Sequence, residues 1–117
     1  MPGISIHVVD VSRGVVASGM RVELFGVSDG TPRLVTAGNL SSTGVLADPV
    51  LNGRFAPGFY EAWFHAAEYY RAAGVAAPAV PFLDVIRYRF GIADPEAHYH
   101  LPMKCTPWGY SCFRGGA

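Results

Sequence analysis

The 117-residue sequence has only two cysteines and one lysine, and it has no long hydrophobic run. The two cysteines, Cys105 and Cys112, are too few for a disulfide scaffold, so both are expected to remain thiols in a reducing compartment. No apolar run approaches the roughly 20 residues that span a bilayer, which excludes a membrane protein. Nine basic and nine acidic residues cancel, so the positive charge excess typical of nucleic-acid-binding proteins is absent.

Neither end of the sequence carries a recognisable targeting signal. The first residues, Met1 to Ser5, lack the basic and apolar segments of a signal peptide. The last residues, Arg114 to Ala117, match no peroxisomal or retention signal. We therefore expect a cytoplasmic protein. The length suits a single domain, residues 1–117, and a hydrophobic fraction of 50% leaves apolar surface for partner subunits.

Alternation of polar and apolar residues predicts a chain built mostly of short β-strands. Only residues 66–73 favour a helix, and Gly74 stands where a helix commonly ends. Residues 38–53 are rich in loop-forming residue types. Many short strands with one short helix indicate an all-β sandwich. The predicted strands cover residues 4–9, 20–24, 34–36, 58–64, 85–90, 97–104 and 108–113.

The strand predicted for residues 97–104 holds the densest set of chemically useful side chains. Because side chains alternate along a strand, His98 and His100 share one face with Pro102 and Lys104. Such a histidine pair is an ordinary polar strand edge, a pair of zinc ligands, or an acid–base pair. No third ligand is spaced to complete a zinc site, so we expect no metal there.

Two further residues are weak candidates when each is taken alone. His7 lies on the face of the first predicted strand opposite the isoleucines, where a lone histidine is usually packed or hydrogen-bonded. Arg54 follows Gly53 in a tight turn, and the simplest interpretation is a surface arginine.

Four segments become more informative when they are taken in order along the chain. They are His7-Val8-Val9-Asp10, Gly53-Arg54, Phe90-Gly91-Ile92-Ala93-Asp94-Pro95-Glu96-Ala97-His98-Tyr99-His100-Leu101-Pro102, and Pro107-Trp108-Gly109-Tyr110-Ser111. Together they resemble the 5-hydroxyisourate hydrolases, the transthyretin-like enzymes of urate breakdown, over nearly the whole chain. The resemblance implies a transthyretin-like sandwich of two sheets and eight strands with one short helix. It also implies a homotetramer, a dimer of dimers, with active sites in the channel between the dimers.

The resemblance further implies a reaction, the hydrolytic opening of the six-membered ring of 5-hydroxyisourate without a metal or an organic cofactor. The implied catalytic set is His7, Arg54 and His100. One imidazole would take a proton from the attacking water, and the other would orient that water or protonate the departing ring nitrogen. Arg54 would bind ring oxygens and neutralise the developing oxyanion. Which histidine acts as the base stays open, and His98 is implied as a neighbour of the set.

The C-terminal tail departs from the family pattern, which usually ends in Tyr-Arg-Gly-Ser with the serine in the active site. Here the chain ends in Phe113-Arg114-Gly115-Gly116-Ala117, so both hydroxyl groups are missing. The resemblance implies that this part of the chain lies near the substrate. The candidate substrate-binding residues are His98, Lys104, Ser111, Phe113, Arg114 and Gly116.

Lys104 is a second departure, because the family normally has leucines in this part of the strand. It shares a face with His100 and lies about 13 Å farther along the strand. The simplest interpretation is neutral drift, with the ammonium group reaching solvent. Alternatively, the channel is adapted to a different substrate, and a buried amine serves as a base or forms an imine.

Three functional hypotheses therefore remain. The favoured one is hydrolysis of 5-hydroxyisourate despite the altered tail. The second is a relative recruited, for example in biosynthesis, to another reaction on a small carbonyl or heterocyclic substrate. The third is a non-enzymatic ligand-binding protein, as transthyretin itself is, and the retention of His7, Arg54 and His100 argues against it. All three predict a small-molecule ligand, with no nucleic-acid or membrane partner.

Overall fold

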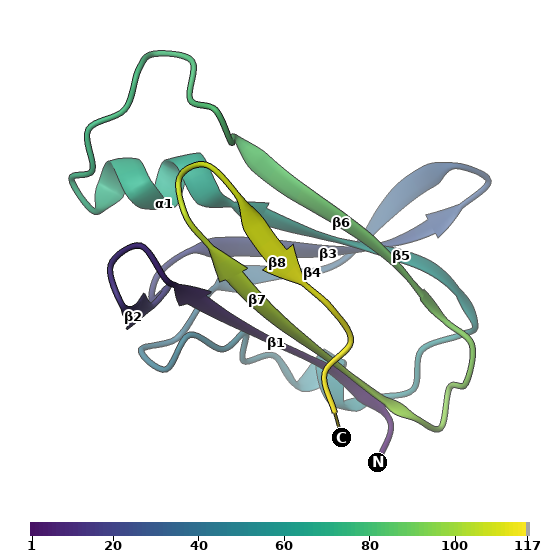
Figure 1. Cartoon of the computed structure of the whole chain (residues 1–117). Helices are drawn as coiled ribbons and strands as arrows, with labels where there is room; N and C mark the ends of the chain where they lie inside the picture. Colours follow the sequence, from purple (N-terminus) through teal and green to yellow (C-terminus); the bar gives the residue numbers. More distant parts are fainter. Residues whose placement is uncertain (117) are drawn as a thin grey trace.

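Eight strands form two facing sheets in the computed structural model, which describes residues 1–116 (Figure 1). Sheet A has the strand order β2-β1-β7-β8, and sheet B has the order β4-β3-β5-β6. The helix α1 (Ala66–Ala72) and the 3-10 helix η1 (Pro49–Asn52) complete the elements of this described part. The predicted two-sheet, eight-stranded sandwich with one short helix is confirmed. The strands are β1 (Gly3–Asp10), β2 (Val15–Val16), β3 (Arg21–Ser28), β4 (Thr31–Asn39), β5 (Gly58–His65), β6 (Val85–Ile92), β7 (His98–Cys105) and β8 (Tyr110–Cys112).

The core lies between the two sheets because alternate side chains of each strand point inward. Ile4, Ile6 and Val8 of β1 are buried with Leu101 and Met103 of β7. They pack in one cluster with side chains of sheet B, which include Val22, Leu24, Ala62 and Phe64. The intervening residues of β1 and β7 therefore lie on the outer face of sheet A.

The pairing of β1 with β7 joins the beginning of the chain to its end. The two strands run parallel, and the register pairs Gly3 with His98 and Asp10 with Cys105. Figure 1 shows the N- and C-terminal ends of the chain close together, at the end of sheet A where β7 begins. This long-range contact determines which polar side chains become neighbours on the outer face.

Several boundaries differ from those predicted. β4 covers nine residues, because β3 and β4 pair almost to the tip of their hairpin, where Asp29 and Gly30 form the turn. Both turn residues have positive φ, 51° and 74°, as a tight two-residue hairpin requires. The elements β2 and η1 were not predicted, since two and four residues are too few to show a periodicity. No helix of the described chain is long and apolar enough to cross a membrane.

Candidate active site

The outer face of sheet A gathers three of the four histidines of the sequence. In the β1–β7 register, Ser5 lies opposite His100 and His7 lies opposite Pro102, while His98 begins β7. All three imidazole-bearing residues are half-buried and alternate with buried core residues. The structure therefore brings His7, His98 and His100 onto one surface.

Ser5 connects two of these histidines. Its Oγ lies 2.6 Å from Nδ1 of His100 and 2.8 Å from Nε2 of His98. At the other side of the His98 ring, Nδ1 lies 3.3 Å from the carbonyl oxygen of Pro2. The four groups form one continuous chain of hydrogen bonds, Pro2–His98–Ser5–His100.

The carbonyl group of Pro2, at one end of this series of hydrogen bonds, determines which group donates in each of the others. A carbonyl oxygen can only accept, so Nδ1 of His98 carries a proton, and Nε2 of the neutral ring is then an acceptor. The Ser5 hydroxyl donates to that Nε2, which leaves its oxygen to accept from Nδ1–H of His100. The neutral His100 ring therefore has an unprotonated Nε2. These tautomers follow from the hydrogen-bond network, and they make His100 the candidate general base.

The C-terminal tail lies against His100. The Gly115 amide donates a 2.7 Å hydrogen bond to the His100 carbonyl oxygen. A Cβ atom added at Gly115 would lie only 2.7 Å from Cδ2 of the His100 ring, so this close approach requires glycine. The neighbouring Arg114 stacks on the Tyr99 ring at 4.0 Å and donates to the His98 carbonyl oxygen at 3.4 Å. The tail therefore contacts both histidine-bearing positions of β7.

A valine stands beside His7. Val45 forms an isolated antiparallel bridge with His7. The preceding Gly44 packs so tightly that an added Cβ would lie 2.8 Å from the Val8 carbonyl oxygen and 3.4 Å from the His7 ring. Its φ of 77° also favours glycine. Val45, which follows Gly44 and lies next to His7, therefore places an apolar side chain at this position.

Arg54 lies in the loop that follows η1 and is engaged by Glu96. Its Nε and Nη2 donate to the two carboxylate oxygens at 2.6 and 2.9 Å, and both side chains are more than half exposed. The hydrogen bonds and charge of Glu96 raise the pKa of the Arg54 guanidinium. Among residues 1–116, no hydrogen bond or ion pair joins Arg54 to His7, His98 or His100.

The expected grouping of Arg54 with His7 and His100 is thus not found in this chain. In the loop between β4 and β5, two residues directly follow a glycine, namely Val45 and Arg54. The backbone bridge shows that Val45 is the one that lies next to His7. Local sequence cannot distinguish the two positions, because the choice depends on a contact between residues 38 positions apart.

The remaining candidate residues lie farther along the same sheet or in the tail. Lys104 pairs with Val9 on one side and with Ser111 on the other, and its side chain is exposed. The buried amine considered from the sequence is therefore not present in this chain. Phe113 and Gly116 are exposed residues of the tail.

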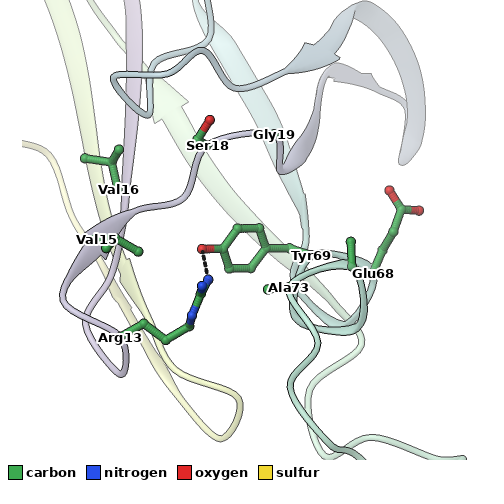
Figure 2. A pocket seen from close by; sticks show the side chains of 9 residues that line it. Arg13, Val15, Val16, Ser18, Gly19, Glu68, Tyr69 and Ala73 are labelled. Atoms are coloured by element: carbon green, nitrogen blue, oxygen red, sulfur yellow. Dashed lines mark hydrogen bonds between the residues drawn. The ribbon is translucent and has the colours of Figure 1, made fainter.

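A groove with a volume of about 400 Å³ borders the histidine cluster. Ser5 and Val45 line the groove and also contact the histidines, and Asn52, the last residue of η1, also lines it. A larger depression of about 490 Å³ lies between β2 and α1 (Figure 2), where Arg13 donates to the Tyr69 hydroxyl at 3.2 Å. No histidine lines either hollow, but Ser5 and Val45 line the smaller groove and each contacts a histidine, so that groove is the one adjacent to the candidate site.

Cysteine and metal chemistry find little support in the described chain. Both cysteines are free thiols, and burial raises the pKa of Cys112 to about 11 and also raises that of Cys105. Neither thiol is therefore a ready nucleophile near neutral pH. Within residues 1–116, no group of three or more His, Cys, Asp or Glu side chains is placed to hold a metal ion. A cofactor-free reaction remains a prediction.

Three residues that contact the histidines were not predicted from the sequence, namely Ser5, Val45 and Gly115. Serine is common on a strand face, so nothing singled out Ser5 as a partner of two imidazoles. The other two lie beside histidines only through isolated bridges, His7 with Val45 and His100 with Gly115. The only available signal was the position of Ser5 two residues before His7, which places both on one face.

Two four-stranded sheets of this order, with a histidine cluster on one outer face, define a transthyretin-type β-sandwich. The model of the HIUase/Transthyretin family matches residues 4–115. This chain belongs to that family.

Several known proteins are similar over nearly the whole chain. The 5-hydroxyisourate hydrolase of Deinococcus radiodurans is 43% identical, covering 97% of this chain and 96% of its own. The 5-hydroxyisourate hydrolase 2 of Rhizobium meliloti is 39% identical, covering 96% and 94%. A crystal structure of (S)-allantoin synthase matches with a TM-score of 0.88 and 35% identity over 97% of this chain, which spans only 43% of that longer chain. The Klebsiella pneumoniae 5-hydroxyisourate hydrolase, at 24% identity and a TM-score of 0.80 over 99% and 100% of the two chains, shows the shared fold.

Proposed function

We propose that this protein hydrolyses 5-hydroxyisourate by opening its six-membered ring. The observation that carries the proposal is the hydrogen-bonded chain Pro2–His98–Ser5–His100, which leaves Nε2 of His100 free to accept a proton. The 39% and 43% identical relatives that are named 5-hydroxyisourate hydrolases support the substrate. The groove lined by Ser5, with a volume of about 400 Å³, offers room for a small ring.

In this mechanism, Nε2 of His100 takes a proton from water as the water oxygen attacks a ring carbonyl carbon. The carbon–nitrogen bond of the ring then breaks, and the departing nitrogen receives a proton. The charge that appears on His100 is stabilised because its Nδ1–H donates to Ser5, which is itself hydrogen-bonded to His98. His7 lies one step along the sheet, where it can orient the water or return the proton to nitrogen.

A hydrolysis assay tests the proposal directly. The substrate is freshly generated 5-hydroxyisourate, and its spontaneous decay is subtracted. We expect the native protein to exceed the spontaneous rate by more than about tenfold, and the His100→Asn variant to lose most of that excess. Decay at the spontaneous rate in the presence of micromolar native protein would refute the proposal.

A second candidate function is hydrolysis of a different small cyclic amide or a reaction on another small carbonyl compound. The observation that favours it is Val45 beside His7, together with a tail that ends without serine. Under this alternative, 5-hydroxyisourate decays at the spontaneous rate while a cyclic ureide such as hydantoin is consumed. A protein that only binds ligands would turn over neither compound.

We also propose that the protein is a cytoplasmic homotetramer. Large apolar side chains are exposed at and near β8, namely Trp108, Tyr110 and Phe113, as are Val11 and Val15 at the same end of sheet A. The strands β6 and β8 are open sheet edges on which a second copy can pair. Light scattering at micromolar concentration should report a tetramer, and a stable monomer would contradict this proposal.

A further inference from the structure

The row of residues next to His7 on the outer face of sheet A contains one cation. His7 pairs with Pro102, and the next outward position of β7 is Lys104, which pairs with Val9. Parallel neighbouring strands lie about 5 Å apart and rise about 3.3 Å per residue, so the Cα atoms of His7 and Lys104 are about 8 Å apart on the diagonal. An extended lysine side chain reaches most of that distance, so Nζ and the His7 ring, on the same face, can contact one small ligand.

The two arginines near this face, Arg54 and Arg114, already interact with other side chains. Arg54 is held in a bidentate ion pair with Glu96, and Arg114 stacks on Tyr99. Val45, the direct neighbour of His7, carries no charge. Lys104 makes no ion pair and no side-chain hydrogen bond with residues 1–116, and its side chain is exposed. Of these three cationic side chains of residues 1–116, the Lys104 ammonium group is therefore the one that remains available to a ligand.

We propose that Lys104 is a substrate-binding residue of this site and that its Nζ binds an anionic or carbonyl oxygen of the ring substrate. The inference rests on the proposed function for the identity of the ring, and on the β1–β7 register for the position of the amine. Across the strand pair, Ser111 stands directly opposite Lys104 and offers an exposed hydroxyl group to the same ligand.

In this arrangement, Lys104 of β7 supplies the positive charge of the site. An ammonium group beside the attacked carbonyl stabilises the negative charge that develops on its oxygen, provided that the group is aimed there before the reaction. The site then selects ring compounds that carry negative charge or several carbonyl oxygens, and it disfavours cationic or purely apolar rings. Lys104 would contact the oxygen, while the proton transfers stay with the histidines.

The sequence offers an unusually clean test, because Lys104 is its only lysine. Reductive methylation with 13C-formaldehyde labels Lys104 and the N-terminal amine and preserves their charge, so the NMR spectrum contains two signals. The Lys104→Met variant identifies the Lys104 signal by removing it. The probe is urate, a stable purine trione that is a monoanion near neutral pH.

We expect saturating urate to shift the Lys104 signal. Lys104→Met should weaken urate binding about tenfold or more, and Lys104→Arg should retain most of the affinity. The matched control is Arg33→Met, which removes an exposed cation from β4 of the other sheet and should leave the affinity within about twofold. A signal that does not move, a lack of urate binding by the native protein, or equal affinities of the two Met variants would each overturn the proposal.

The hydrolysis assay on the same samples separates this inference from the proposed function. Urate bound at Lys104 without 5-hydroxyisourate hydrolysis refutes the function and leaves Lys104 as a binding residue. Hydrolysis by a protein whose Lys104 signal does not respond to urate refutes the role of Lys104 alone.

Discussion

At the scale of single residues, the site depends on one hydroxyl group shared by two imidazoles. The Ser5 Oγ has one proton, so it donates to one ring and accepts from the other. Because Pro2 fixes the tautomer of His98, Ser5 transmits that constraint to His100. His100 is thereby held with its lone pair on Nε2, as its proposed role as general base requires.

The Ser5→Ala variant tests this coupling. Without the hydroxyl group, the His100 ring loses the partner of Nδ1, and both the tautomer and the ring orientation are no longer fixed. We expect kcat for 5-hydroxyisourate to fall about 10- to 100-fold, with little change in KM, because proton transfer rather than binding is impaired.

Two control variants sharpen the result. Ser5→Thr keeps the hydroxyl group and suits a strand, so it should retain most of the activity. Ser42→Ala removes an exposed hydroxyl in the loop after β4 and should have no effect. If Ser5→Ala were as active as Ser42→Ala, Ser5 would not position His100.

At the scale of the elements, the tail and β7 act as one unit. The tail crosses β7 at the two histidines, with Gly115 bonded to the His100 backbone and Arg114 stacked on Tyr99. A contact this close is possible only because Gly115 has no side chain. The tail therefore lacks the serine hydroxyl group that the resemblance to the family implied, but the tail still lies close to His100.

The Gly115→Ala variant should disturb the site without unfolding the sandwich. Its Cβ would lie 2.7 Å from the His100 ring and 3.2 Å from Pro102, so either the ring or the tail must move. We expect kcat/KM to fall at least about tenfold, while the melting temperature changes by only a few degrees. The matched control is Gly109→Ala in the β7–β8 turn, where an added Cβ meets nothing within 4 Å. Equal activity of the two variants would contradict this role of the tail.

Alternation along the strands predicted which side chains share a face, but it could not predict which strands become neighbours. It correctly placed His98, His100 and Lys104 on one side of β7, because a strand has a fixed period of two. The parallel pairing with β1 joins residues more than 90 positions apart, and no local pattern encodes it. The same limit explains why the contact between Val45 and His7 was not predicted.

At the scale of the whole molecule, a buried carboxylate links sheet A to α1. Asp10, at the end of β1, is fully buried and accepts hydrogen bonds from Ser12, Tyr69 and Tyr70 at 2.6, 3.1 and 2.9 Å. Burial by itself raises the pKa of this carboxyl, but the hydrogen bonds outweigh it and hold the pKa below its ordinary value. The ionised carboxylate is therefore favoured in the folded state.

The lowered pKa predicts a pH dependence of stability. Its contribution is fully present above the unfolded-state pKa of about 3.9 and is lost as the pH falls through the lower folded-state value. We expect Asp10→Asn to lower the free energy of unfolding by about 1–3 kcal/mol at pH 7 and by less near pH 3. Urea unfolding at both pH values measures the difference, with Asp29→Asn in the exposed β3–β4 turn as the control. A deficit that is the same at pH 7 and pH 3 would contradict this account of Asp10.

We expect hydrolysis to take place at the histidine cluster on sheet A and not to depend on Arg54. The most direct test compares kcat/KM for 5-hydroxyisourate in the His100→Asn and Arg54→Gln variants. We expect a loss of at least about 100-fold for His100→Asn, because the proposed general base is removed. For Arg54→Gln we expect a change within about threefold, because that side chain forms an exposed ion pair with Glu96. A loss for Arg54→Gln as large as that for His100→Asn would instead show that Arg54 takes part in the reaction.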